Sequence, residues 1–504
     1  MNIKEAKTQI KNAMLAYFSK DEFDCYRIPL EKQRPVLLIG PPGIGKTAVM
    51  EQVASELGVG LVSYSMTHHT RQSALGLPVI VRKNFRGREY DVSEYTMSEI
   101  IGSVYEMMDK TGVREGILFL DEINCVSETL APCMLQFLQY KIFGQHRVPD
   151  GWIVVTAGNP PEYNKSVRDF DVVTWDRLKK IEVVPDYPVW REYASEKGVH
   201  PSVTTYLAAR RKDFYLVENT VEGRKFVTAR GWDDLSEIIK LYEENGLPVD
   251  ESLVEQYLQH PRVAKNFAIY YDLYHKYHSD YQIDKIMAGD PPESIILRAR
   301  MASFDERVSL LGLLYDAANA EMTQVAETEE TLLIWKEELG DILAGMTGGD
   351  GAFQALLPQK NAELQDRLDR GARSSSVSPK KRARIRRVMK TIDDCRRRLV
   401  QESVPDAGVP DKLRGYYREE IAALERAVVG ARQKLDHVFA FYEKAVPEAD
   451  DILLLVTELT AGYHSARFIG HYGCESYFRH NADVLFDERE KNILSQISQL
   501  GLAG

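Results

Sequence analysis

The segment VLLIGPPGIGKTAVMEQVA, residues 36–54, constrains the fold more than any other part of the chain. It contains the pattern G-x-x-x-x-G-K-[ST], from Gly40 to Thr47, between an apolar run and a helix-forming stretch. Glycines at these positions let backbone N–H groups approach phosphate oxygens, and the lysine reaches the β- and γ-phosphates. A plain glycine turn entering a helix gives the same pattern, but the strand before the motif and the helix after it favour a phosphate-binding loop.

The loop lies in a region where short apolar segments alternate with helical stretches, which is typical of a parallel sheet with crossover helices. Five segments are predicted strands: PVLLIG, LVSYSM, GILFLDE, GWIVVTAGN and KKIEVVP. Residues 76–95 alternate around an NFRGRE turn and predict a β-hairpin inserted into the sheet domain, and YKIFGQHRVPDGW predicts a smaller one. We therefore predict an α/β nucleotide-binding domain over residues 1–185.

Helical patterns dominate the rest of the chain. They predict an all-α lid domain over residues 186–285 and a helical C-terminal extension over residues 286–504. In the extension, apolar residues recur at spacings of three and four, with a proline-bearing turn in the middle. This predicts a long, coiled-coil-like helical hairpin at about residues 380–445, although two core helices of a bundle would give the same pattern.

Polar residues follow two of the predicted strands. Asp121 and Glu122 end GILFLDE, and Asn159 ends GWIVVTAGN. Because ligands bind at the carboxyl edge of a parallel sheet, these side chains should lie beside the phosphates. Thr47 and Asp121 are then candidate Mg²⁺ ligands, Glu122 the group that orients and deprotonates the attacking water, and Asn159 a neutral amide that holds it. A lone Asp-Glu or Asn-Pro pair is more often a turn, but the preceding strands favour this interpretation.

The nucleotide is predicted to be ATP. The guanine-selective pattern N-K-x-D is incomplete in this chain, because NKSV at residues 164–167 lacks the aspartate. The predicted nucleotide-binding residues are Gly40, Pro41, Pro42, Gly43, Ile44, Gly45, Lys46, Thr47 and Ala48.

The motifs GPPGIGKT, LFLDEIN, TAGNP, WDRLKKIEV and TARGWDDLS occur in this order and cover about residues 30–285. Together with the inserted hairpin, they resemble the AAA+ ATPases of the MoxR type, from the helix-2-insert branch that also holds magnesium chelatase and dynein. The resemblance implies a homo-oligomer, a hexameric ring with ATP between neighbouring subunits. It also implies an ATP-hydrolysing chaperone or remodelling role, with a protein partner that carries a von Willebrand A domain.

The resemblance also assigns roles to single residues. Lys46, Thr47, Asp121 and Glu122 would act on the nucleotide of their own subunit, and Asn159 matches the position called sensor 1. Two arginines, each of which taken alone could be an ordinary surface cation, match further positions. Arg177 occupies the place of the arginine finger, with Arg168 as a second candidate, and Arg230 matches sensor 2.

Charge and composition limit the partners. The formal net charge of −11 argues against a surface built as a whole to bind nucleic acid or anionic lipid. Residues 380–398 are an exception, with ten basic residues against two acidic ones. They leave a nucleic-acid-binding motor or defence component as an alternative function, although the lack of interleaved aromatic residues favours a solvated face or an acidic protein partner.

The cysteines and the hydropathy pattern give an expectation of location. Five dispersed cysteines without a C-x-x-C pair suit free thiols in a reducing compartment. No run approaches the roughly 18 apolar residues of a membrane span. We expect a soluble cytoplasmic protein.

Overall fold

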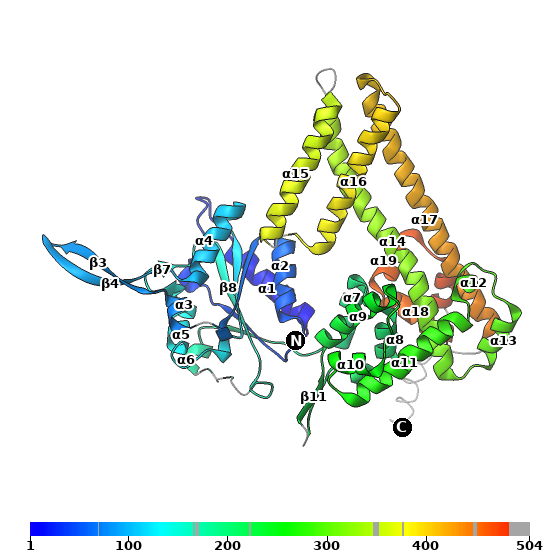
Figure 1. Ribbon diagram of the computed structural model, residues 1–504, viewed down its shortest axis with the longest axis horizontal. Helices are drawn as coiled ribbons and strands as arrows, with labels where there is room; N and C mark the ends of the chain where they lie inside the picture. Colours follow the sequence, from blue (N-terminus) through cyan, green and yellow to red (C-terminus); the bar gives the residue numbers. More distant parts are fainter. Residues whose placement is uncertain are drawn as a thin grey trace, which may run out of the picture. The chain divides into compact units, whose positions relative to one another are not determined.

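The computed structural model describes residues 1–68, 70–164, 167, 170, 172–220, 223–345, 352–374, 377–446 and 451–482. Two compact units divide the chain (Figure 1). The first unit comprises residues 1–189 and 358–389, and the second comprises residues 190–357 and 390–504. The chain therefore leaves the first unit, returns to it for a helical segment, and leaves it again.

A five-stranded parallel sheet forms the centre of the first unit, in the order β2-β5-β8-β1-β9. All five predicted strands are confirmed. Every residue of β8 is buried, as expected for a strand covered on both faces. The strands are β1 (Val36–Ile39), β2 (Gly60–Ser65), β5 (Gly116–Asp121), β8 (Trp152–Gly158) and β9 (Lys179–Glu182).

Helices cover both faces of the sheet, with α1 and α2 on one side and α4 and α5 on the other (Figure 1). Local signals explain where they begin and end. The Asn2 side chain and Glu5 form a capping box at the start of α1, and Ser98 caps α4, which ends at Gly112 in the left-handed region. The helices are α1 (Ile3–Tyr17), α2 (Lys46–Leu57), α3 (Arg71–Leu75), α4 (Glu99–Thr111), α5 (Ala131–Tyr140) and α6 (Val172–Trp175).

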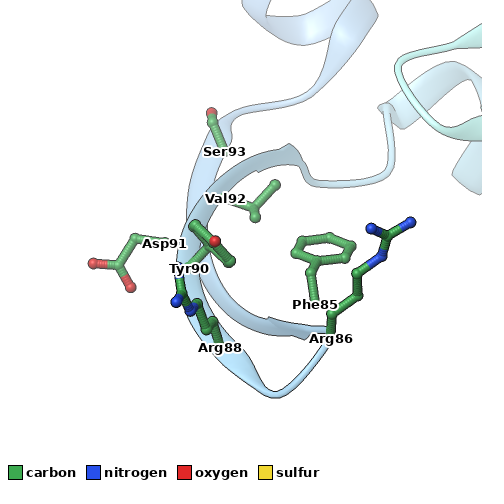
Figure 2. Close-up of a pocket in the computed structure, with 7 residues that line it drawn as sticks. All are labelled: Phe85, Arg86, Arg88, Tyr90, Asp91, Val92 and Ser93. Carbon is green, nitrogen blue, oxygen red and sulfur yellow. The ribbon is translucent and has the colours of Figure 1, made fainter.

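Both predicted hairpins are present in the first unit. Strands β3 (Pro78–Phe85) and β4 (Arg88–Tyr95) pair antiparallel, and their turn residues, Arg86 and Gly87, both have the positive φ that a type I′ turn requires. Figure 2 shows the hollow at the curved end of this hairpin. The smaller hairpin pairs β6 (Ile142–Phe143) with β7 (His146–Arg147).

The second unit is mainly helical. The region predicted to be all-α also contains one antiparallel pair, β10 (Leu216–Thr220) with β11 (Gly223–Val227), which the sequence analysis did not anticipate. The helices of residues 186–301 are α7 (Tyr187–Lys197), α8 (Pro201–Ala209), α9 (Ala229–Glu244), α10 (Glu251–Tyr257), α11 (Pro261–Asp280), α12 (Ile283–Met287) and α13 (Glu293–Met301).

Long helices form the C-terminal extension. The turn predicted between two of them is present, because α16 and α17 are joined through a short 3-10 segment at Asp406–Gly408. Next to the turn, the Arg398 guanidinium lies 2.9 Å from the Glu419 carboxylate and 3.8 Å from the centre of the Tyr416 ring. The helices are α14 (Phe304–Gly345), α15 (Ala352–Ser374), α16 (Pro379–Gln401), α17 (Val409–Ala445), α18 (Asp451–Ala461) and α19 (Tyr463–Tyr472).

The apolar residues that recur at spacings of three and four in α17 form what we call its apolar seam. The C-terminal half of this seam is packed in a core with α14. Leu435, Val438 and Tyr442 are buried in one core together with Leu314 and Met322 of α14. This half of the seam belongs to a bundle core, which is one of the two interpretations that the sequence left open. The coiled-coil character of the α16–α17 pair stays a prediction.

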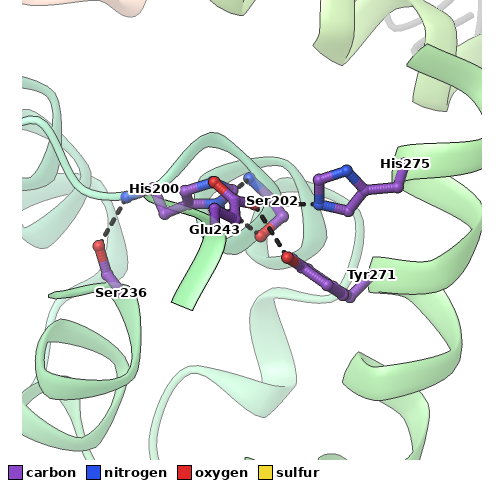
Figure 3. A network of polar contacts seen from close by, with 6 residues as sticks. All are labelled: His200, Ser202, Ser236, Glu243, Tyr271 and His275. Atoms are coloured by element: carbon purple, nitrogen blue, oxygen red, sulfur yellow. Dashed lines mark hydrogen bonds and ion pairs between the residues drawn. The ribbon is translucent and has the colours of Figure 1, made fainter. Parts of the chain in front are cut away.

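A polar network ties three helices of the second unit together (Figure 3). The Glu243 carboxylate accepts hydrogen bonds from Tyr271 at 2.9 Å and lies 3.0 Å from the Nε2 atoms of His200 and His275. His200 Nδ1 also lies 2.8 Å from the Ser202 hydroxyl. This Ser-His-Glu series does not form a hydrolytic site, because Ser202 is fully buried and its backbone N–H donates to the His200 ring as a helix cap. Burial lowers the pKa of His200.

All five cysteines are free thiols, as predicted. Among the described residues, no helix combines the length and the apolar character that a membrane span needs.

The packing of Trp152 generates a stability prediction. A Cβ atom at Gly116 would lie 2.6 Å from the Trp152 ring, so Gly116→Ala forces the ring or the strand to move. We expect a loss of about 1–3 kcal/mol in the free energy of unfolding, measured by urea denaturation. The control is Gly102→Ala in α4, where the nearest atom would be 4.0 Å away. It should be neutral or stabilising by up to about 1 kcal/mol, and equal losses in both variants would contradict the steric explanation.

A buried lysine generates a pH prediction. Lys141 follows α5, is 2% exposed, and donates from Nζ to the Leu138 carbonyl at 2.6 Å. Burial lowers its pKa from 10.5 to about 8. The unfolded chain therefore binds more protons between these two values, and stability should rise with pH across this window.

Lys141→Met removes the buried charge. We expect it to raise the free energy of unfolding at pH 7 by about 2–4 kcal/mol, since each pKa unit corresponds to about 1.4 kcal/mol. The gain should shrink between pH 8 and pH 10.5 as the native lysine loses its proton. Unfolding measured at pH 7, 9 and 10.5 checks this, and a difference independent of pH would contradict it.

Candidate functional site

The loop between β1 and α2 is shaped by its glycines. Gly43 and Gly45 have φ values of 72° and 93°, which favour glycine. A Cβ atom at Gly40 would lie 2.6 Å from the Val183 carbonyl oxygen, so the loop packs closely against the chain after β9. Gly45 is the N-cap of α2, and no side chain caps the helix there. The N–H groups of the first turn are thus directed at the loop, as an anion site requires.

Lys46 lies inside this loop and is only 8% exposed. Its ammonium donates to the carbonyls of Gly40 and Pro41 at 2.7 and 2.8 Å and to Asn159 Oδ1 at 2.8 Å. Asn159 directly follows β8, which neighbours β1 in the sheet. The structure therefore brings these two predicted site residues into direct contact.

Thr47 and Asp121 also meet. The Thr47 hydroxyl donates to Asp121 Oδ2 at 2.9 Å, and the other carboxylate oxygen accepts the backbone N–H of Glu122 at 2.9 Å. A hydroxyl beside a carboxylate is the oxygen donor set that Mg²⁺ prefers. The residues present therefore fit a magnesium ion held between the loop and β5.

Glu122 occupies an unusual backbone position. Its φ is 55°, which is uncommon for a residue with a side chain and is typical of functional sites. Glu122 Oε2 accepts hydrogen bonds from Ser65 at 3.1 Å and Thr67 at 3.2 Å. Ser65 ends β2 and stands opposite Asp121 in the sheet register. Neither hydroxyl was predicted from the sequence, although LVSYSMT ends at the same edge of the sheet as the other site residues.

Asn124 is a further residue that the sequence analysis missed. It is 5% exposed, and its amide donates to the Asn159 backbone carbonyl at 2.8 Å. A Cβ atom at Gly158 would lie 2.4 Å from Asn124 Oδ1, so the glycine leaves room for this contact. Asn124 therefore fixes the backbone of Asn159 and acts as a positioning residue.

The predicted arginines are not among these contacts. Arg177 is exposed and follows α6 in the first unit, where its N–H donates to the Thr174 carbonyl at 3.1 Å. Arg230 is exposed in the first turn of α9, which Thr228 caps, and belongs to the second unit. Arg168 lies outside the described residues. The arginine-finger and sensor 2 roles stay predictions.

Comparison with known families gives one direct match. Residues 36–165 match the model of the ATPase family associated with various cellular activities, abbreviated AAA. This segment is an AAA-family ATPase domain. The match covers the loop, the Asp121–Glu122 pair and Asn159, and the five-stranded sheet continues beyond the matched segment through β9.

No curated protein sequence matches the chain. Among solved structures, the chain is similar to a RuvB lysine-to-arginine mutant from Thermotoga maritima, with 17% identity and a TM-score of 0.26 over 51% of this chain and 69% of that one. A similarity at this level carries no argument about function.

The contact between Asn124 and Asn159 generates a prediction about the AAA domain. Asn124→Ala removes the donor to the Asn159 carbonyl and leaves a gap beside Gly158. If Asn159 has its predicted catalytic role, we expect kcat for ATP turnover to fall about 10-fold or more, with nucleotide affinity changed less than about twofold, because Asn124 would position Asn159 without touching phosphate. Asn245→Ala, at the end of α9, is the control. An equal loss of kcat and affinity would show a general loss of structure instead.

Proposed function

We propose that the AAA domain binds ATP with Mg²⁺ and hydrolyses it. The observation that carries this proposal is the convergence of Lys46, Thr47, Asp121, Glu122 and Asn159 through direct hydrogen bonds at one edge of the sheet. These are a phosphate-binding cation, two magnesium ligands, a carboxylate base and a neutral amide. Each of them has a role in the hydrolysis of a phosphoanhydride.

The residues divide the work as follows. The loop N–H groups and the Lys46 ammonium bind the β- and γ-phosphates, while Thr47 and Asp121 would hold the metal ion. When bound, the metal ion neutralises charge on the phosphate oxygens. Glu122 accepts the proton of the attacking water, and Asn159 holds that water in line with the γ-phosphate.

Arg177 is proposed to complete the site of a neighbouring subunit. Charge that develops on the transferred phosphoryl group needs cations beyond lysine and magnesium, and an arginine supplied by another subunit is one known solution. The exposed position of Arg177 leaves its side chain accessible to a second copy of the chain. A hexameric ring, in which each interface contains one nucleotide, is the assembly that the MoxR resemblance implies.

The energy of hydrolysis is proposed to remodel a protein partner. In this view the protein is a MoxR-like chaperone of the cytoplasm, with Arg230 as sensor 2 and a von Willebrand A domain protein as its partner. Support for this finer role comes from the five sequence motifs and the inserted hairpin β3–β4. Binding energy for the partner must differ between nucleotide states for such work to be done.

A mixing experiment tests the proposed site and its assembly together. Arg177→Ala should bind ATP but turn it over at least about 100-fold more slowly, and Glu122→Gln should do the same for lack of a base. When the two inactive variants are mixed in equal amounts, about a quarter of the interfaces pair an intact Glu122 with an intact Arg177 in a ring of identical contacts. We expect turnover to recover to about this fraction.

The possible results test three points separately: the action of Arg177 across an interface, its place in the site, and the phosphate loop. No recovery on mixing would mean that Arg177 does not act across an interface. Unchanged turnover in the Arg177→Ala protein would remove the residue from the site altogether. Lys46→Ala, which should abolish nucleotide binding in isothermal titration, is the control for the phosphate loop itself.

A further inference from the structure

A dense group of cations lies where α15 ends and α16 begins. We define this basic corner as residues 367–374 and 377–390, which contain ten Lys or Arg residues and one acidic residue, Asp369. Seven of the ten are arginines. The chain as a whole has a net charge of −11, so this concentration of positive charge is local.

The corner is an ordered pair of helices with an apolar inner face. The Asn361 amide on α15 donates to the Met389 carbonyl on α16 at 3.1 Å, which places the two helices side by side (Figure 1). Leu364 and Leu368 of α15 and Ile385 and Val388 of α16 are buried. Eight of the ten basic residues are exposed, whereas Arg382 and Arg384 are half-buried. The pair therefore has an apolar inner face and a mainly basic outer face.

Ion pairs reduce the number of cations in residues 380–398 that a partner can contact. At its C-terminal end, Arg396, Arg397 and Arg398 are paired with Asp393, Asp394 and Glu419. By contrast, the exposed residues Arg373, Lys381, Arg386 and Lys390 form no ion pair within the described part of the chain. Arg370 of the basic corner is also paired, with Asp366. The cations available to a partner therefore include these four residues of the basic corner and not the arginine triplet.

The surroundings of these cations exclude several kinds of partner. Among described residues 354–399, no large apolar side chain is exposed, whereas protein interfaces depend on buried apolar or aromatic anchors and membrane-surface helices insert apolar ones. No aromatic residue lies between Phe353 and Tyr416, so bases of a single strand have nothing to stack on. What remains is a regular array of phosphates, which arginine guanidinium groups bind in bidentate fashion.

We propose that the basic corner binds the phosphate backbone of double-stranded DNA, without reading its sequence. The proposal goes beyond ATP hydrolysis, because it concerns where the protein is held and does not require turnover. Binding of this kind is governed by counterion release, so its affinity falls steeply with salt.

Fluorescence anisotropy with a labelled duplex of about 30 base pairs tests this, without nucleotide and between about 50 and 200 mM salt. Lys381→Ala/Arg386→Ala is compared with Arg396→Ala/Arg397→Ala, which removes the same charge from the same helix. We expect the first variant to bind at least about 10-fold more weakly. The slope of log affinity against log salt concentration should also become less steep by about two, one for each cation removed. The second should stay within about threefold of the native protein, because its arginines already have acidic partners.

Each other outcome overturns the proposal. Equal weakening in the two double variants would mean that net charge alone drives binding. If the protein binds a single strand of the same length, or poly-glutamate, as tightly as the duplex, its partner is not double-stranded DNA. Circular dichroism and ATP turnover of the variants, both expected to be unchanged, separate a failure of this surface from a failure of the AAA site.

Discussion

The Lys46 ammonium determines how the candidate site is arranged. A buried ammonium is costly unless acceptors surround it, and this one is satisfied by two loop carbonyls and the Asn159 side chain. The contact with Asn159 exists because β8 lies directly beside β1, so the end of one strand faces the loop that follows the other. The order of the strands therefore places the Asn159 side chain within hydrogen-bonding distance of the Lys46 ammonium.

Much of this arrangement could be predicted from the sequence because it rests on local patterns. Apolar runs of four to seven residues separated by helical stretches identify parallel strands, and all such strands end at one edge of their sheet. Motifs at the ends of three strands must therefore converge, whatever the details of packing. This is why Thr47, Asp121, Glu122 and Asn159 could be assigned to one site before any distance was known.

The remaining site contacts depend on information that no local pattern contains. Ser65 and Thr67 reach Glu122 only because β2 neighbours β5 and because Glu122 adopts a positive φ. Asn124 reaches the Asn159 backbone only because Gly158 has no side chain. The seam of α17 is likewise ambiguous in sequence, since burial against α14 and a coiled-coil partner demand the same spacing. The roles proposed for Arg177 and Arg230 depend on contacts outside the first unit of one chain. Arg177 is proposed to reach the nucleotide of another subunit, and Arg230 lies in a different unit from the nucleotide loop.

Apart from Lys390, the basic corner belongs to the same compact unit as the nucleotide loop, since residues 358–389 group with residues 1–189 although residues 190–357 separate them in sequence. A ligand held at the basic corner and a nucleotide held at the loop would then act on one folded body. If one ligand changes the affinity for the other, linkage requires that the reverse effect have the same size. A chain that hydrolyses ATP while bound to DNA could in this way couple its residence on DNA to its nucleotide state, with no additional contact between the two ligands.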